Sequence, residues 1–148
     1  MTPAVFRVVL DTNEIVAAGS RWLDTGLPTS GYNAHLRLLI VVAARHSGLY
    51  CDGILDEYAR VLLERRHPPD RVRRLLAYIQ GAFAHVEITS SAAPTPPSDP
   101  DDEVFLLCAL DGDADYLVSE DTHLLALQSH YQRPLITTCS ECLTDLPS

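Results

Sequence analysis

Four acidic residues stand at points of the chain where carboxylates could act together on a metal ion. Two follow short apolar runs and two lie in the first turns of amphipathic segments: Asp11, Asp121, Asp102 and Glu57. Gathered carboxylates repel each other, by roughly 4 kcal/mol for a pair about 4 Å apart at an effective dielectric of about 20. A hard cation such as Mg²⁺ or Mn²⁺ removes that cost, and it also activates water for attack on phosphorus.

The elements that must position these residues alternate between strands and helices. Apolar periodicity, caps and Gly or Pro stops predict strands over 6–10, 49–51, 85–88, 115–119 and 134–138. The same signals predict helices over 12–18, 33–48, 54–67, 70–83, 99–112 and 121–128, with Gly48 as a helix stop and Asp99 as a cap, and loops over 19–32 and 89–98. This alternation predicts an α/β domain with a mainly parallel sheet.

In such sheets ligands bind beyond the carboxyl ends of the strands, where the strand order reverses. If the first and fourth strands are neighbours, Asp11 and Asp121 meet there, and the helices carrying Glu57 and Asp102 begin at the same edge. Each residue also has a plainer interpretation. Asp11 and Asp121 can cap helices, Asp102 can face a helix dipole, and Glu57 can be a solvated helix residue. The placement of the whole set on one edge favours a shared site.

Length, composition and net charge limit the possible functions of the chain. The chain has 148 residues, which suits one domain over 1–148, and it is 47% hydrophobic with a net charge of −9. Its eleven basic residues are all arginine. This acidity argues against a general phosphate-binding surface, although not against an enzyme whose carboxylates hold cations. We see neither an apolar run of membrane length nor a secretory leader, so we expect no membrane partner and a cytoplasmic location.

Two other motifs have features of metal sites. Cys139 and Cys142 form a C-x-x-C pair, but no second pair accompanies it, so the cysteines are predicted to be small buried apolar residues. The aspartates at 111, 113 and 115 have the spacing of a calcium loop. Tyr116 and Thr122 occupy the positions where that loop needs Gly and Glu, so we predict a helix-to-strand turn instead.

Four ordered segments resemble the motifs of PIN-domain ribonucleases: VVLDTNEIVAA, ILDEYARVL, DPDDEVFLLCAL and DYLVSEDTHLL. The resemblance covers about residues 7–143 and is closest to bacterial toxin components of toxin–antitoxin pairs. It implies a three-layer fold with a five-strand, mainly parallel sheet flanked by helices, with the first and fourth strands adjacent. It also implies a metal-dependent endoribonuclease, with a cognate antitoxin and a second copy of the chain as partners.

The resemblance also implies roles for residues. Mg²⁺ or Mn²⁺ would be held by Asp11, Glu57, Asp102 and Asp121, which would also be the catalytic residues, with Asn13 and Ser119 in support. Asp102 is chosen within the run 101–103 by its distance from Phe105. Glu14 departs from the family pattern, which is usually apolar there. An inward-facing Glu14 would add charge to the site, and an outward-facing one would be harmless.

Four residues are candidates for RNA binding: Arg21, Trp22, Arg60 and Arg65. Six arginines lie between residues 60 and 74, either as a solvated surface or as a basic face that guides RNA or an acidic partner. Trp22 can stack on an unpaired base or pack in the core. The histidines show no ligand spacing, although His123 lies close to Asp121 in sequence.

Two rival functions remain. The domain can be a catalytically weak module that docks a partner protein or RNA. A phosphohydrolase with an aspartyl nucleophile ranks low, because Asn13 stands where a second Asp is needed and the chain has no lysine.

Overall fold

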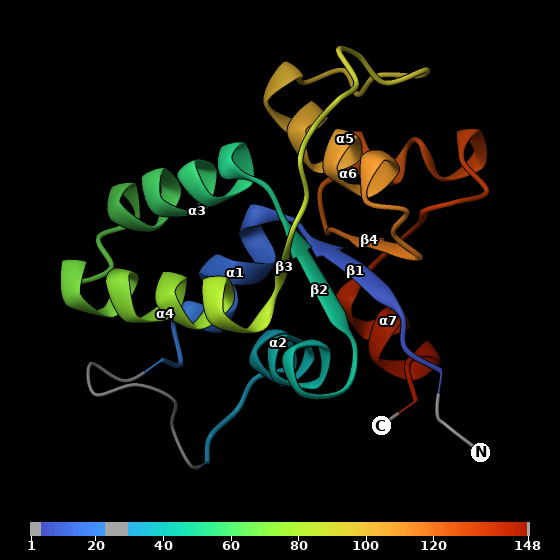
Figure 1. Cartoon of the computed structure of the whole chain (residues 1–148). Helices are drawn as coiled ribbons and strands as arrows, with labels where there is room; N and C mark the ends of the chain where they lie inside the picture. The colour runs from blue at the N-terminus through green and yellow to red at the C-terminus, as the bar shows by residue number, and fades with distance from the viewer. Residues whose placement is uncertain (1–3, 23–29, 148) are drawn as a thin grey trace.

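A parallel sheet forms the centre of the molecule. The computed structural model describes residues 4–22 and 30–147. Within these residues one sheet has the strand order β3-β2-β1-β4-β5, with every neighbouring pair parallel (Figure 1). Its strands are β1 (Arg7–Leu10), β2 (Ser47–Tyr50), β3 (Ala84–His85), β4 (Tyr116–Val118) and β5 (Leu135–Thr137). The predicted α/β fold and the adjacency of the first and fourth strands are confirmed.

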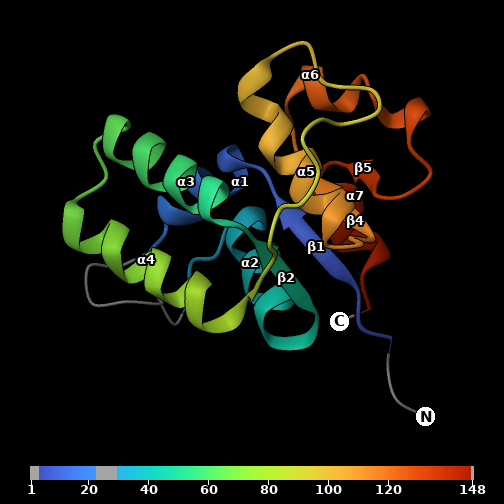
Figure 2. The same ribbon diagram turned by 45° about the horizontal axis from the view of Figure 1, so that its top comes forward.

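Helices connect the strands and cover both faces of the sheet. They are α1 (Thr12–Gly19), α2 (Ala34–Arg45), α3 (Asp52–Glu64), α4 (Pro69–Ala82), α5 (Glu103–Asp111), α6 (Thr122–Leu125) and α7 (Cys139–Asp145), with short 3₁₀ turns at Pro100–Asp102 and Gln128–His130. The strand order reverses direction at β1, so right-handed connections place α5 on the face opposite to α1 and α2. The arrow of β1 points to the part of the molecule where α3, α5 and α6 lie (Figures 1 and 2).

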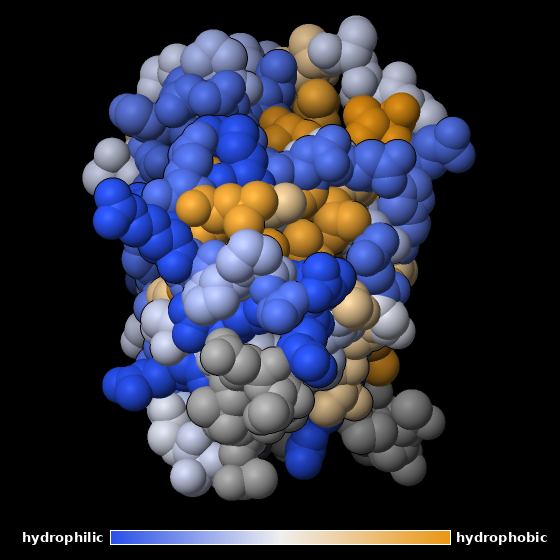
Figure 3. All heavy atoms as spheres, turned by 90° about the vertical axis from the view of Figure 1, so that its left-hand side faces the viewer, coloured by the Kyte–Doolittle hydropathy of each residue, from blue (hydrophilic) through white to orange (hydrophobic). Residues whose placement is uncertain are grey.

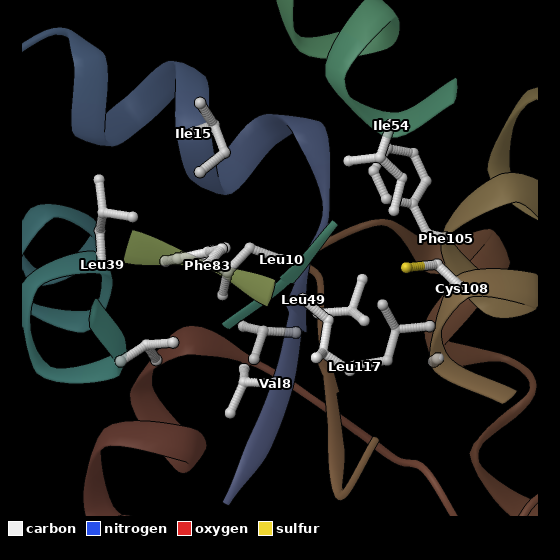
Figure 4. Close-up of a cluster of buried hydrophobic side chains, with 14 of the residues drawn as sticks. Val8, Leu10, Ile15, Leu39, Leu49, Ile54, Phe83, Phe105, Cys108 and Leu117 are labelled. Atoms are coloured by element: carbon white, nitrogen blue, oxygen red, sulfur yellow. The ribbon is translucent and has the colours of Figure 1, made fainter. Parts of the chain in front are cut away.

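The alternation of side chains along β1 divides the core into two layers. Val9 pairs with Leu49 and Leu117, so these three side chains point to one face, toward α5. Val8 and Leu10 point to the other face. Figure 4 shows this division, with Cys108 and Phe105 beside one layer and Leu39 and Ile15 beside the other. These strand residues are at most 1% exposed, which explains the nearly continuous apolar runs in the sequence.

The second helix and strand differ from the sequence prediction at their junction. Helix α2 ends at Arg45 rather than at residue 48, and Gly48 belongs to β2. The reason is a close contact, because a Cβ atom at Gly48 would lie 2.5 Å from ring atoms of Phe83. Gly48 therefore lets an aromatic side chain pack directly on the strand backbone and does not act as a helix stop.

Three further differences concern short elements. Strand β3 has two residues where four were predicted, and the helix predicted over 99–112 begins as a 3₁₀ turn. Helix α7 was not predicted, although Thr138 and Glu141 form the Thr-x-x-Glu pattern of a helix start and the Thr138 side chain accepts from the Glu141 N–H. Part of the loop predicted over 19–32 lies outside the described residues.

The other two motifs have structural roles. All four cysteines are free and buried, as predicted. Asp111 accepts hydrogen bonds from Thr89 N and Ser90 N, and Asp115 accepts one from Arg7 N. Asp113 has a left-handed backbone with φ of 52°. These aspartates therefore build the turn that leads into β4.

The surface over α3 and α4 is mostly polar and carries most of the arginines (Figure 3). The side of the molecule that carries α3 and α4 is largely hydrophilic, interrupted by a band of hydrophobic residues (Figure 3). Of the arginines between residues 60 and 74, all but Arg71 are exposed. Among the described residues, no helix is both long enough and apolar enough to cross a membrane.

Candidate functional site

The end of the central strand presents the first carboxylate. Asp11 follows β1, and its N–H donates to the Val118 carbonyl, which continues the pairing with β4. Its side chain is held at both oxygens: Oδ1 accepts from Thr12 N and Oδ2 accepts from Ser119 Oγ, each at 2.7 Å. Asp11 is thus a helix cap, as the plainer interpretation held. It is also fixed in the crevice between two adjacent strands.

Ser119 joins Asp11 to the next acidic residue. Its hydroxyl donates to Asp11 and accepts from Asp121 N at 2.9 Å, so one buried side chain sets the positions of both. Asp121 caps α6 by accepting from His123 N at 2.7 Å. The second oxygen of Asp121 is left for other partners, because capping uses only Oδ1.

Asp102 carries the least satisfied carboxylate of this region. Only 8% of the residue is exposed, and its Oδ2 atom is buried without a hydrogen-bond partner among the described residues. The Nδ1 atom of His123 lies 3.9 Å from that oxygen, too far for a hydrogen bond. Asp101 is exposed, so burial distinguishes Asp102 from its neighbour.

Glu57 lies on α3, and a hydrogen bond connects this helix to the end of β1. The Tyr58 hydroxyl, fully buried, donates to the Leu10 carbonyl at 2.5 Å, and this contact places the first turns of α3 beside Asp11. Glu57 itself accepts from Arg60 Nη2 at 2.5 Å. Arg60 also donates to Glu64 Oε1 at 2.8 Å, so one guanidinium lies between two glutamates.

These residues share one cleft with a volume of about 260 Å³. Its lining includes all four sequence-predicted carboxylates and Asn13, whereas Ser119 lies behind Asp11. Of the candidates for RNA binding, Arg60 and Arg65 line the cleft and the exposed Arg21 does not. Trp22 is 3% exposed and packs on Tyr78, with ring centroids 5.1 Å apart. Of its two interpretations, core packing describes it.

The electrostatics of the cleft show how crowded these carboxylates are. Burial raises the pKa of Asp102 to about 7, and the negative charges of Asp121, Asp11 and Asp99 add to the effect. Burial also raises the pKa of Asp11, although its hydrogen bonds from Ser119 and Thr12 oppose that change. The protein thus holds carboxyl groups where their ionised forms are disfavoured.

The donor set fits a hard divalent cation. All four predicted ligands offer carboxylate oxygens, and Asp102 offers one that no described residue satisfies. Such oxygen-rich sets hold Mg²⁺ and Mn²⁺, and a cation would offset the repulsion that raises the pKa of Asp102. The arrangement can therefore hold a divalent metal ion.

Two further residues of the site were not assigned to it from sequence. Asp99, Asp102 and His123 each place a ligand atom within 4.8 Å of the others. Asp99 was interpreted as a cap, and it is one, accepting from Asp101 N at 3.0 Å. Its position as a cap gave no sign that it lies close to Asp102 and His123. His123 had one signal, its position two residues after Asp121.

Glu14, the departure from the family pattern, faces inward but is not among the residues that line the cleft. It is 2% exposed, and its Oε2 atom lies 2.5 Å from His35 Nδ1. Its charge is therefore directed to a different neighbourhood, between α1 and α2.

Comparison with known proteins agrees with this geometry. The family model of the PIN domain matches residues 7–123, a range that includes all four predicted carboxylates and most of the sheet. No curated protein and no solved structure matches the chain. PIN domains are generally metal-dependent nucleases that act on RNA and bind divalent metals through acidic residues. The match over most of the chain shows that this protein belongs to the PIN-domain family.

Proposed function

We propose that this protein is a Mg²⁺- or Mn²⁺-dependent endoribonuclease that hydrolyses RNA phosphodiester bonds, acting as the toxin of a toxin–antitoxin pair. The observation that carries the proposal is the unpartnered, buried oxygen of Asp102 in a cleft that also holds Asp11 and Asp121. Such an arrangement is unfavourable unless a cation completes it.

Within this proposal Asp11, Glu57, Asp102 and Asp121 hold the metal and are the catalytic residues. A bound divalent ion supplies charge neutralisation and Lewis-acid activation of water and of the phosphoryl oxygen. The chain supplies the positioning. Ser119 keeps the Asp11 carboxylate in one rotamer through its 2.7 Å hydrogen bond.

The walls of the cleft are suited to a polyanion. Arg60 and Arg65 line it, and both are exposed on α3 or at its end. We propose that they contact phosphates on either side of the scissile bond, while Asn13 offers a neutral amide at the mouth of the cleft. Because the chain is acidic overall, this local pair of cations would direct the RNA backbone to the cleft rather than to the surface at large.

A nuclease assay tests the chemistry. Purified protein is incubated with an end-labelled single-stranded RNA in Mn²⁺, Mg²⁺ or EDTA. We expect cleavage with either metal, none in EDTA, and at least about 100-fold less in Asp11→Asn, since even outer partners of metal sites are worth 10–100-fold. Asp113→Asn, an exposed aspartate in a left-handed turn that Asn tolerates, is the matched control.

Cleavage by Asp11→Asn at the parental rate would contradict the assignment. RNA binding without cleavage in any metal would instead favour the catalytically weak docking module. The toxin role is supported by the motifs that resemble toxin components. It predicts that expression of the chain in bacteria arrests growth, that Asp11→Asn does not, and that a small neighbouring gene encodes a protein that restores growth. A homodimer is a further proposal, tested by light scattering.

A further inference from the structure

A second group of ligand-type side chains lies outside the acidic cleft. Glu14 is in the first turn of α1 and is 2% exposed. Its Oε2 atom contacts His35 Nδ1, but its Oε1 atom is buried with no hydrogen-bond partner in the described part of the chain. A buried polar atom without a hydrogen-bond partner destabilises the folded state. The contact with His35 therefore satisfies only one of the two carboxylate oxygens of Glu14.

Cys139, the first residue of α7, supplies a third donor. Glu14, His35 and Cys139 each place one ligand atom within 4.8 Å of the others. The group is assembled where α2 packs against both α1 and α7 (Figure 1). Cys139 is 2% exposed, whereas the His35 side chain is 30% exposed, so an ion can enter from the His35 side.

We propose that Glu14, His35 and Cys139 form a second metal site, which takes Zn²⁺. Carboxylate oxygen, imidazole nitrogen and thiolate sulfur are the three ligand types of zinc, and three protein ligands leave a fourth position for water. Mg²⁺ and Mn²⁺ do not favour sulfur, so the two sites of the chain select different ions. A divalent ion with one carboxylate, one thiolate and a neutral imidazole has no net charge, which suits a buried position.

The thiol must lose its proton for this site to form. Burial raises the pKa of Cys139 to about 12, so the residue is a thiol until a metal replaces the proton, and binding releases it to solvent. The start of α7 is fixed by the Cys139 N–H, which donates to Glu120 Oε1 at 3.0 Å. Cys142, its C-x-x-C partner, is fully buried and outside the group. The proposed site is therefore not the zinc motif suggested by Cys139 and Cys142.

Cobalt substitution tests the site directly, because Co²⁺ replaces Zn²⁺ and reports sulfur ligation by a charge-transfer absorption in the near ultraviolet. The titration uses the full chain, both unmodified and with Asp11→Asn and Asp121→Asn to weaken the acidic cleft. We expect a thiolate band in both proteins, saturating at one equivalent in the protein with the weakened cleft, and Zn²⁺ should abolish it in both. The lack of this band in the unmodified protein would by itself overturn the proposal.

Variants identify the ligands. Cys139→Ala should abolish the band, and Cys142→Ala, a matched loss of a buried cysteine from the same helix, should keep it. Glu14→Gln and His35→Ala should weaken Zn²⁺ binding by more than about tenfold, the lower range for outer-shell partners. A band that survives Cys139→Ala would refute the assignment. Mn²⁺ binding should be unchanged in Cys139→Ala, so the proposals of a zinc site and of a nuclease site are tested independently.

Discussion

Replacing Asp102 by Asn should stabilise the metal-free protein at alkaline pH. Folding raises the pKa of Asp102 from 3.8 to about 7, so the folded state binds its proton more tightly than the unfolded chain does. The favourable contribution is fully present below pH 3.8 and is lost as pH rises through about 7. At pH 8 the difference corresponds to roughly 4 kcal/mol, which screening at the mouth of the cleft reduces to ~1–2 kcal/mol.

Asn keeps the shape of the side chain and removes the charge, so it should recover that free energy. For a chain of this length the gain is a rise in Tm of about 2–8 °C at pH 8. The assay is thermal unfolding followed by circular dichroism in EDTA, at pH 5 and pH 8. Asp101→Asn, the exposed neighbour, is the control and should give little change at either pH.

Added Mn²⁺ should reverse the order of thermal stability, so that the parent protein has a higher Tm than Asp102→Asn. Under the proposed function, Mn²⁺ should bind the folded parent and raise its Tm by mass action, whereas Asp102→Asn, which lacks a proposed ligand, should gain little. The reasoning is refuted if Asp102→Asn is no more stable than the parent in EDTA at pH 8. It is equally refuted if the difference does not shrink between pH 8 and pH 5, because a packing effect would not depend on pH in this way.

Other changes test the supports of the site. Ser119→Ala should weaken Mn²⁺ binding about 10–100-fold in calorimetry, because Asp11 loses the donor that orients it; an unchanged affinity would show that Thr12 N suffices. Tyr58→Phe should lower the free energy of unfolding by about 1–3 kcal/mol in urea titration, since the Leu10 carbonyl loses its buried donor. Gly48→Ala should cost about 1–3 kcal/mol, because its Cβ would lie 2.5 Å from the Phe83 ring; Gly81→Ala, with nothing near its Cβ, is the control that should not destabilise.

The fold class and the placement of the four carboxylates around one cleft could be predicted from local patterns together with the family resemblance. Apolar runs that end in a polar residue mark parallel strands, and parallel strands end at one edge. Asp11 and Asp121 are therefore expected to lie close together if β1 and β4 are neighbours. The family resemblance implied this adjacency, and the pairing of Val9 with Leu117 confirms it.

The parts that escaped prediction depend on contacts between distant residues. Asp99 has the same local appearance whether it only caps a turn or also faces a ligand, so sequence favoured the simpler role. The partner of Glu14 is His35, 21 residues away, and only the packing of α1 against α2 shows that they meet. Gly48 was interpreted as a helix stop because the ring of Phe83, which explains it, comes from the far end of α4.

The central place of β1 has a consequence for how the protein is made. Its two neighbours come from far along the chain, and the contact between Asp11 and Ser119 spans 108 residues. A nascent or truncated chain that stops before β4 would leave one edge of β1 bare, an apolar strand open to pairing with other molecules. Such a fragment should be prone to aggregation and would lack Asp121 and Ser119, so the cleft is complete only after β4 and the residues that follow it have been synthesised.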